Sequence, residues 1–81
     1  MPKSGTVVIA TAGRDKDGLF AVLTTDDKWA FIADVKRRPL ERPKRKSLRH
    51  LRETGVCLDP SAMATNRELR RVLQKLRNTI T

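Results

Sequence analysis

Residues 6–25 read TVVIATAGRDKDGLFAVLTT, and this stretch decides the fold. Its first seven residues are β-branched or small and apolar, which is typical of a strand. Residues 13–18 then supply the Gly and Asp residues that tight turns favour, and a second apolar run follows over residues 19–25. The pattern predicts two antiparallel strands joined by a polar turn.

The segments that follow extend this β pattern. After a polar break at residues 26–28, residues 29–33 read WAFIA and predict a third strand. Leu48 and Leu51, three apart, predict a single helical or 3₁₀ turn, and residues 55–58 predict a short closing strand. With a short fourth strand in between, the expected fold is mostly β, with about five short strands.

The C-terminal segment carries the signature of an amphipathic helix. Thr65 and Glu68 fit a capping box, which places the helix start near Asn66 and predicts a helix over about residues 66–80. The apolar stripe expected to pack on the strands consists of Leu69, Val72, Leu73, Leu76 and Ile80. The opposite side carries Arg67, Arg70, Arg71, Lys75 and Arg77. We interpret that side as a solvated face, with a second RNA contact as the alternative.

The charge of the chain is concentrated in one segment. Eighteen Lys and Arg against nine Asp and Glu give a formal net charge of +9, and residues 36–52 alone carry +8. Because the rest of the chain is nearly neutral or only weakly charged, this segment indicates a dedicated contact surface for an anionic partner. The 81 residues leave room for one small domain, and we expect no deep catalytic cleft.

Residues 36–46 form the most basic part of that segment. Pro39 and Pro43 forbid a regular helix and disfavour a central strand, so we expect an extended, exposed loop whose charges contribute little to stability. Guanidinium and ammonium groups are phosphate ligands, so the loop is expected to bind RNA. The predicted RNA-binding residues, which include basic neighbours of the loop, are Arg14, Lys16, Lys36, Arg37, Arg38, Arg42, Lys44, Arg45, Lys46, Arg49 and Arg52.

Aromatic residues are scarce. We assign Phe20 and Phe31 to the core, and Trp29 to the core or its rim, with base stacking as the alternative for Trp29. Binding of single strands usually uses several stacking aromatics, whereas folded RNA can be recognised through its backbone and shape. The composition therefore favours structured RNA.

Other kinds of chemistry have little support in the sequence. His50 is the only histidine and Cys57 the only cysteine, so we expect no catalytic residues, metal site, cofactor or small-molecule substrate, and we interpret Cys57 as a buried, inert thiol. The aspartates at positions 15, 17, 26 and 27 are expected to bond to turn backbone. No apolar run approaches the length of a membrane span, so we expect a cytoplasmic protein without a membrane partner.

Several segments together resemble a known motif. Residues 5–8 (GTVV) and 12–16 (AGRDK), followed by Phe20 and Val22, resemble the KOW motif of RNA-binding and ribosomal proteins. The likeness continues through residues 32–34, 37–38, 43–46, 48–51 and 65–70. The chain thus resembles the small bacterial KOW-domain RNA-binding proteins, which are similar to a KOW-type large-subunit ribosomal protein of archaea and eukaryotes. Asp17 and Val35 depart from the pattern, because glycine is common at both places.

The resemblance implies an SH3-like (KOW) barrel over about residues 4–58, with the helix packed on it, in a single domain spanning residues 1–81. It also implies a ribosome-associated role. We therefore expect a protein that binds ribosomal or other structured RNA and is monomeric off the ribosome. The alternatives are a protein-interaction module of the transcription or translation machinery, because fold does not dictate function, and a DNA-binding or nucleoid protein.

Overall fold

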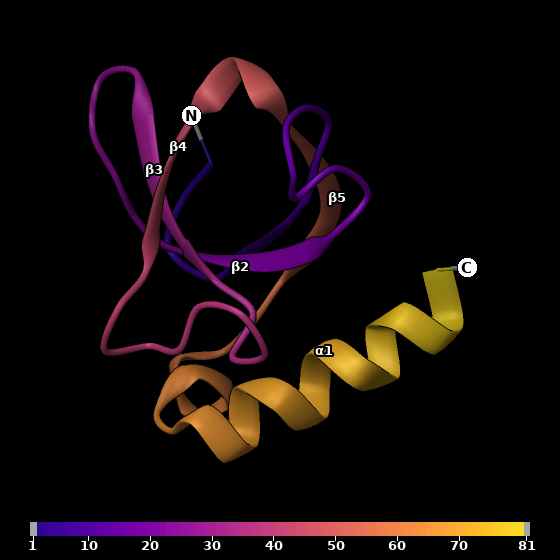
Figure 1. The fold of residues 1–81 in the computed structure, drawn as a ribbon. Coiled ribbons are helices and arrows are strands. Elements are labelled where there is room, and N and C mark those ends of the chain that lie inside the picture. The colour runs from indigo at the N-terminus through magenta and orange to yellow at the C-terminus, as the bar shows by residue number, and fades with distance from the viewer. Residues whose placement is uncertain (1, 81) are drawn as a thin grey trace.

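One antiparallel sheet of five strands forms the body of the protein in the computed structural model (Figure 1). The structure describes residues 2–80, and for Ile80 the backbone alone. The strands lie in the order β4-β3-β2-β1-β5. Their bounds are β1 Thr6–Ala10, β2 Leu19–Thr25, β3 Trp29–Ala33, β4 Lys44–Ser47 and β5 Leu51–Cys57. The 3₁₀ turn η1 (Leu48–His50) links the two edge strands, so the sheet curls into the small barrel-like, mostly β fold that the sequence predicts.

Successive side chains of a strand point to opposite sides of the sheet. In β1 and the first half of β2 both sets are buried, whereas in β3 the first residue, Trp29, is exposed. Val8, Phe20 and Ile32 belong to a cluster inside the curled sheet, against which Leu48 of η1 and Leu51 of β5 pack. Their neighbours in sequence belong to a second cluster, which includes Val7, Leu19, Ala21 and Ala33 and which the helix covers. This double burial explains why these strands read as continuous apolar runs rather than as alternating ones.

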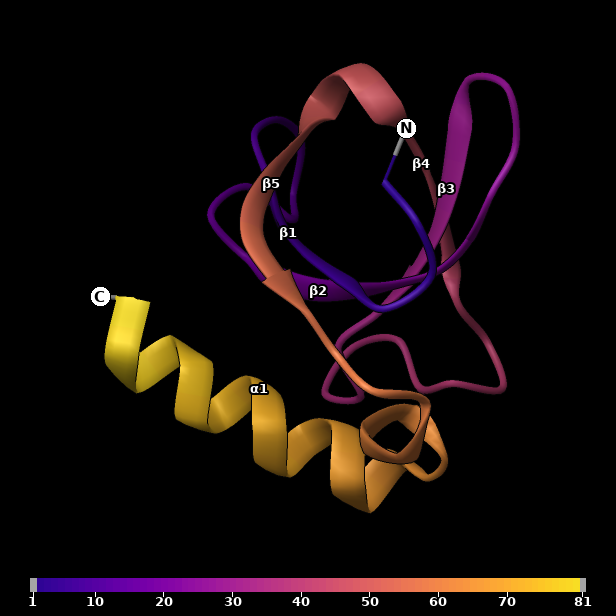
Figure 2. The same cartoon turned by 180° about the vertical axis from the view of Figure 1, so that it is seen from behind.

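The helix α1 (Asn66–Ile80) lies along one side of the curled sheet (Figure 2), and its Leu69 and Leu73 belong to the second cluster. Its predicted start is confirmed, because the Thr65 Oγ1 accepts a hydrogen bond of 3.2 Å from the backbone N–H of Glu68. Leu69 and Leu73 are fully buried and Val72 and Leu76 are half-buried, as predicted, whereas the side chain of Ile80 lies outside the described residues. Over residues 2–80 no helix has both the length and the apolar character needed to cross a membrane.

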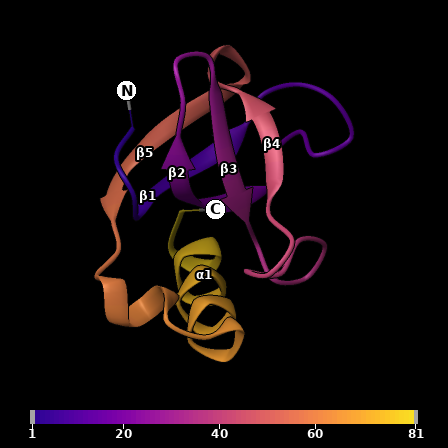
Figure 3. The ribbon, with the colours of Figure 1, turned by 90° about the vertical axis from the view of Figure 1, so that its left-hand side faces the viewer.

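The basic segment, residues 36–46, is attached to the start of the helix by two hydrogen bonds. The backbone N–H of Leu40 donates to the Asn66 Oδ1 at 2.8 Å, and the Asn66 Nδ2 donates to the Glu41 Oε1 at 2.6 Å. A short 3₁₀ turn, η2 (Pro60–Met63), brings the chain from β5 to the helix start (Figure 3). The helix N-terminus therefore fixes the middle of the basic segment against the body.

Three sequence expectations were wrong in detail. Residues 44–46 belong to strand β4, not to a loop; β4 is an edge strand, where a preceding proline and charged side chains are tolerated. The closing strand begins at Leu51, four residues before Gly55. Cys57 is exposed, because it lies at the end of the other edge strand with its side chain on the solvent face.

Two residues without glycine's freedom adopt a left-handed backbone. Asp17 and Val35 both have a φ of 70°. These are the two positions where the KOW pattern commonly has glycine, which reaches this conformation without a steric penalty. In this protein, side chains with a Cβ adopt the conformation at both positions, at some cost in stability.

Replacing Asp17 by Gly is expected to raise the free energy of unfolding by about 1 kcal/mol, because the left-handed conformation penalises a Cβ. The Asp17 side chain is exposed, so little packing is lost. Denaturant unfolding measures the change. Asp27→Gly is the control, since Asp27 is an exposed turn residue outside the left-handed region, where glycine should be neutral or destabilising. Equal stability of Asp17→Gly and the unaltered protein would contradict this prediction.

Candidate nucleic-acid interface

A buried carboxylate, Asp15, organises the basic residues of β4. Asp15 lies in the turn between β1 and β2, and its side chain is only 6% exposed. The Lys44 Nζ donates a hydrogen bond to its Oδ2, the Lys46 Nζ lies 3.8 Å from the same oxygen, and an Arg37 guanidinium nitrogen lies 3.7 Å from Oδ1. The structural role predicted for Asp15 is thus present, but its side-chain partners are cations rather than turn amides.

This cluster leaves positive charge in excess. The hydrogen bond from Lys44 lowers the pKa of Asp15, and the nearby charges of Lys44, Lys46 and Arg37 add to that effect, outweighing the opposing influence of burial. Three cations around one carboxylate give a net charge of +2. Lys46 is nearly buried and also donates to the backbone oxygen of Ala12 at 2.8 Å. The two lysines are therefore fixed structural groups that still contribute a positive field.

Replacing Asp15 by Asn is expected to lower the free energy of unfolding by about 2 kcal/mol at pH 7, because Lys44 and Lys46 lose their charged partner. The folded-state pKa of Asp15 is depressed, so its contribution is full above the unfolded value of 3.8 and is lost as pH falls through the folded value. Urea unfolding at pH 7 and at pH 3 measures both. The two proteins should differ less at pH 3, and a constant difference would exclude this linkage.

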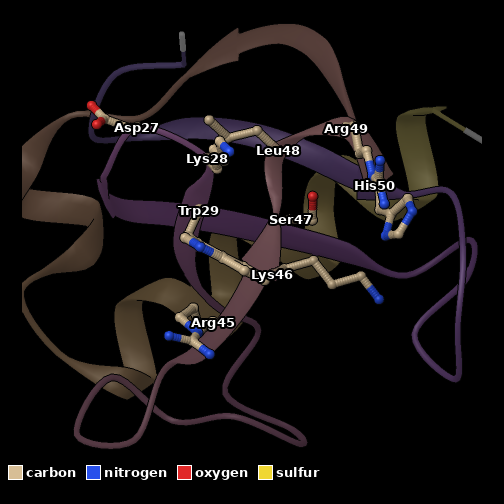
Figure 4. A pocket seen from close by; sticks show the side chains of 9 residues that line it. All are labelled: Asp27, Lys28, Trp29, Arg45, Lys46, Ser47, Leu48, Arg49 and His50. Carbon is tan, nitrogen blue, oxygen red and sulfur yellow. The ribbon is translucent and has the colours of Figure 1, made fainter.

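An open groove lies beside β3 and β4 (Figure 4). The Arg45 guanidinium lies over the Trp29 ring, 4.5 Å from its centroid. Trp29 is 37% exposed, the large apolar residue most open to solvent in the described chain. The groove, of about 720 Å³, is lined by Asp27, Lys28, Trp29, Arg45, Lys46, Ser47, Leu48, Arg49 and His50. Its lining contains four Lys and Arg residues and one acid.

Strand register produces this arrangement. Trp29 pairs with Ser47 and Phe31 pairs with Arg45, so the four side chains share the outer face of the β3–β4 ladder. Their neighbours Ala30 and Lys46 are paired and buried on the other face. Arg45 is the diagonal neighbour of Trp29 and is long enough to reach across its ring.

The first half of the basic segment projects outward from a tight turn. The buried Asp34 accepts hydrogen bonds of 2.9 Å from the backbone N–H groups of both Arg37 and Arg38. With the backbone held in this way, the side chains of Lys36, Arg37 and Arg38 are exposed. Two hollows adjoin this turn; their basic lining residues are Lys16, Lys36 and Arg37, joined by Arg70 and Arg77 of the helix.

The structure thus sorts the predicted residues. The exposed ones are Arg14, Lys16, Lys36, Arg37, Arg38, Arg42, Arg45, Arg49 and Arg52, whereas Lys44 is half-buried and Lys46 buried. Arg45 and Arg49 line the groove with exposed side chains, and Lys46 borders it with its ammonium buried against Ala12 and Asp15. Arg52 lies on β5 opposite Ile9 and outside the groove lining. The predicted RNA-binding set does not include Lys28, which lines the groove, and the sequence gives Arg70 and Arg77 only as an alternative contact on the helix face. Lys28 directly precedes Trp29 in a turn, and that adjacency was the available signal.

Phe20 is buried as predicted, while Phe31 is only partly covered. Among the other turn aspartates, the Asp26 Oδ1 accepts a hydrogen bond of 2.7 Å from the Asp27 backbone N–H, as expected.

Comparison with protein-family models and with curated protein sequences found no match to this chain. Its function is therefore inferred from the charges and geometry of these residues.

Proposed function

We propose that the protein binds structured RNA and that this RNA belongs to the ribosome. The observation that carries the proposal is the crowding of cations along residues 36–49, which hold eight Lys and Arg residues, six of them exposed, and one Glu. Within the described residues, no carboxylate lies at salt-bridge distance from Lys36, Arg38, Arg42, Arg45 or Arg49. A surface of this kind attracts a polyanion. The resemblance to KOW-domain proteins supports ribosomal RNA and a cytoplasmic location.

The binding mechanism rests on a rigid presentation of these cations. Asp34 fixes the turn below Arg37 and Arg38, and Asn66 fixes the backbone at Leu40. Because the backbone is already ordered, docking on phosphates costs mainly the rotamer freedom of the side chains. Arginine forks bind phosphate oxygens in pairs, while lysines act as mobile point charges.

Structured RNA is favoured over single strands by the number of exposed aromatics. Trp29 is the one large aromatic exposed in the described chain, and sequence-tolerant single-strand binders stack successive bases on several such rings. A folded RNA holds its phosphates at fixed distances from one another. A compact cationic face matches such an array better than it matches a flexible single strand. In this role the protein is a binding module without catalytic residues or a cofactor.

RNA binding is expected to weaken steeply with salt. If about five phosphates are neutralised, the slope of log K against log salt should be about −4.5, using the duplex-DNA value as a proxy. A fourfold rise in salt should then reduce affinity by about 500-fold. Fluorescence anisotropy with a labelled RNA at several salt concentrations measures the slope, and an affinity indifferent to salt would contradict an electrostatic mechanism.

Two further titrations distinguish RNA binding from the alternative functions of DNA binding and protein interaction. A folded ribosomal RNA fragment and a duplex DNA of equal charge are titrated at the same salt, and tighter binding of the RNA is expected. Tighter binding of the DNA would favour a nucleoid role. Absence of binding to both would favour a protein-interaction module of the transcription or translation machinery.

A further inference from the structure

We propose that the Trp29–Arg45 pair is a stacking site for one unpaired nucleobase of the bound RNA. This inference rests on the proposed RNA-binding function and specifies the feature that the RNA must present. The groove beside β3 and β4 carries it, because it joins an exposed aromatic ring, a planar cation and additional positive charge in one place (Figure 4).

The exposure of Trp29 is not explained by the fold. Ala30 and Ile32, its neighbours along β3, are fully buried, and they fill the interior without help from the tryptophan. Trp29 instead occupies the outer face of the ladder at 37% exposure. Covering an aromatic ring of this size with another flat group would remove apolar surface from water and stabilise a complex.

Arg45 extends the ring into a two-layer platform. Its guanidinium lies 4.5 Å from the ring centroid, a cation–π geometry that holds the planar group in place. Among the described residues no carboxylate pairs with Arg45, so its charge remains available to a ligand. A nucleobase can stack on the guanidinium plane or on exposed ring surface, because both are flat and polarisable.

The rest of the groove suits the phosphates that flank such a base. Lys28 lies beside Trp29, and Arg49 lies at the far end of the lining, beyond the Ser47 hydroxyl. The Lys46 ammonium is bound to the Ala12 backbone oxygen and lies near the Asp15 carboxylate. It therefore contributes positive electrostatic potential to the groove rather than a free hydrogen-bond donor. Asp27 is the single acidic residue of the lining. The groove therefore combines a stacking surface with anion-binding groups on both sides.

A nucleotide fits this combination better than an acidic peptide does. Carboxylates would satisfy Lys28, Arg45 and Arg49 but would leave the Trp29 ring uncovered, whereas a nucleotide supplies both a flat ring and a phosphate. We infer that the RNA presents a bulged or loop nucleotide to this groove while its paired part contacts the basic segment. Such a nucleotide gives selectivity that phosphate contacts alone do not supply.

The test compares two hairpin RNAs of equal charge, one with a single bulged adenosine and one fully paired. Trp29 is the only tryptophan, so intrinsic fluorescence reports on the site directly. The bulged hairpin should bind about tenfold more tightly, the lower part of the range for one stacked base, and should quench the Trp29 emission. The paired hairpin should bind without quenching.

Variants separate stacking from charge. Trp29→Leu should abolish the preference for the bulged hairpin and leave affinity for the paired one unchanged, while Trp29→Phe should retain part of the preference. Arg45→Lys keeps the charge but not the plane, and it should reduce the preference with little change in the salt slope. Melting temperatures confirm that each variant is folded.

The two failures are distinguishable. If the unaltered protein binds both hairpins equally with unchanged emission, the stacking site is wrong and the proposed RNA-binding function stands. If Trp29→Leu retains the full preference, the stacking site is also wrong. If neither hairpin binds, the RNA-binding function fails and the stacking site fails with it.

Discussion

Leu73→Asp is expected to leave the protein largely unfolded at room temperature. Leu73 is 1% exposed and belongs to the cluster formed with Val7, Leu19 and Leu69. The substitution removes a buried leucine and places a carboxylate in an apolar site without a hydrogen-bond partner, which together cost about 4 kcal/mol or more. A domain of this size has only about 4–12 kcal/mol to lose. Thermal unfolding followed by circular dichroism measures the change.

The matched control is Gln74→Asp, which puts the same residue at the next position of the same helix. Gln74 is exposed, so this change should lower stability by no more than about 0.5 kcal/mol. If Leu73→Asp had the same melting temperature as Gln74→Asp, the apolar stripe of the helix would not be part of the folded core and would serve a partner instead.

Replacing Lys36, Arg38 and Arg42 together by Glu is expected to lower RNA affinity by about 10²-fold or more, because three phosphate ligands become repulsive charges. All three side chains are exposed, and none is within salt-bridge distance of a carboxylate in the described chain. The fold should therefore be retained. Anisotropy titration with the folded RNA measures affinity, and the melting temperature checks the fold.

The control for this variant is Arg67, Arg71 and Lys75 to Glu, an equal change of charge on the helix. Arg71 and Lys75 line a hollow against η2, away from the basic segment. A greater loss of RNA affinity in the control than in the segment variant, with both proteins folded, would identify the helix as the primary RNA surface.

The choice of residues for this experiment shows where the sequence misled. Lys44 and Lys46 were expected to be exposed loop charges whose reversal leaves stability unchanged. Because both approach Asp15, glutamates there would gather three carboxylates in a nearly buried place and unfold the barrel. Asp15 and Lys44 are 29 residues apart, so their pairing depends on how the sheet curls, which local patterns do not contain.

Elements with strong periodic or turn signals were predictable. The second and third strands and the helix start at Asn66 agree with the structure, because apolar runs, turn residues and a capping box are local features. The groove was not predictable in the same way. It depends on Trp29 pairing with Ser47, and a register shift of one residue would turn Arg45 to the other face.

The left-handed backbone at Asp17 and Val35 is a local feature, yet their residue types do not predict it. Nothing in the side chains of Asp17 or Val35 predicts a φ of 70°, and Val35 is β-branched, which makes this conformation especially unfavourable. The resemblance to the KOW motif marks both positions only as departures from glycine and leaves their backbone conformation open. Val35 also packs in the cluster under the helix, and that burial offsets part of the backbone cost.

Ultraviolet crosslinking in living cells, followed by sequencing of the attached RNA and identification of the crosslinked peptide, tests the central claim most directly. The claim is that residues 28–49 bind ribosomal RNA. We expect ribosomal RNA to dominate the recovered sequences, at a small number of folded sites, and the crosslinked peptides to come from residues 28–49 with Trp29 among the attachment points. Failure to recover RNA above background, or crosslinks confined to residues 67–75 of the helix, would contradict it.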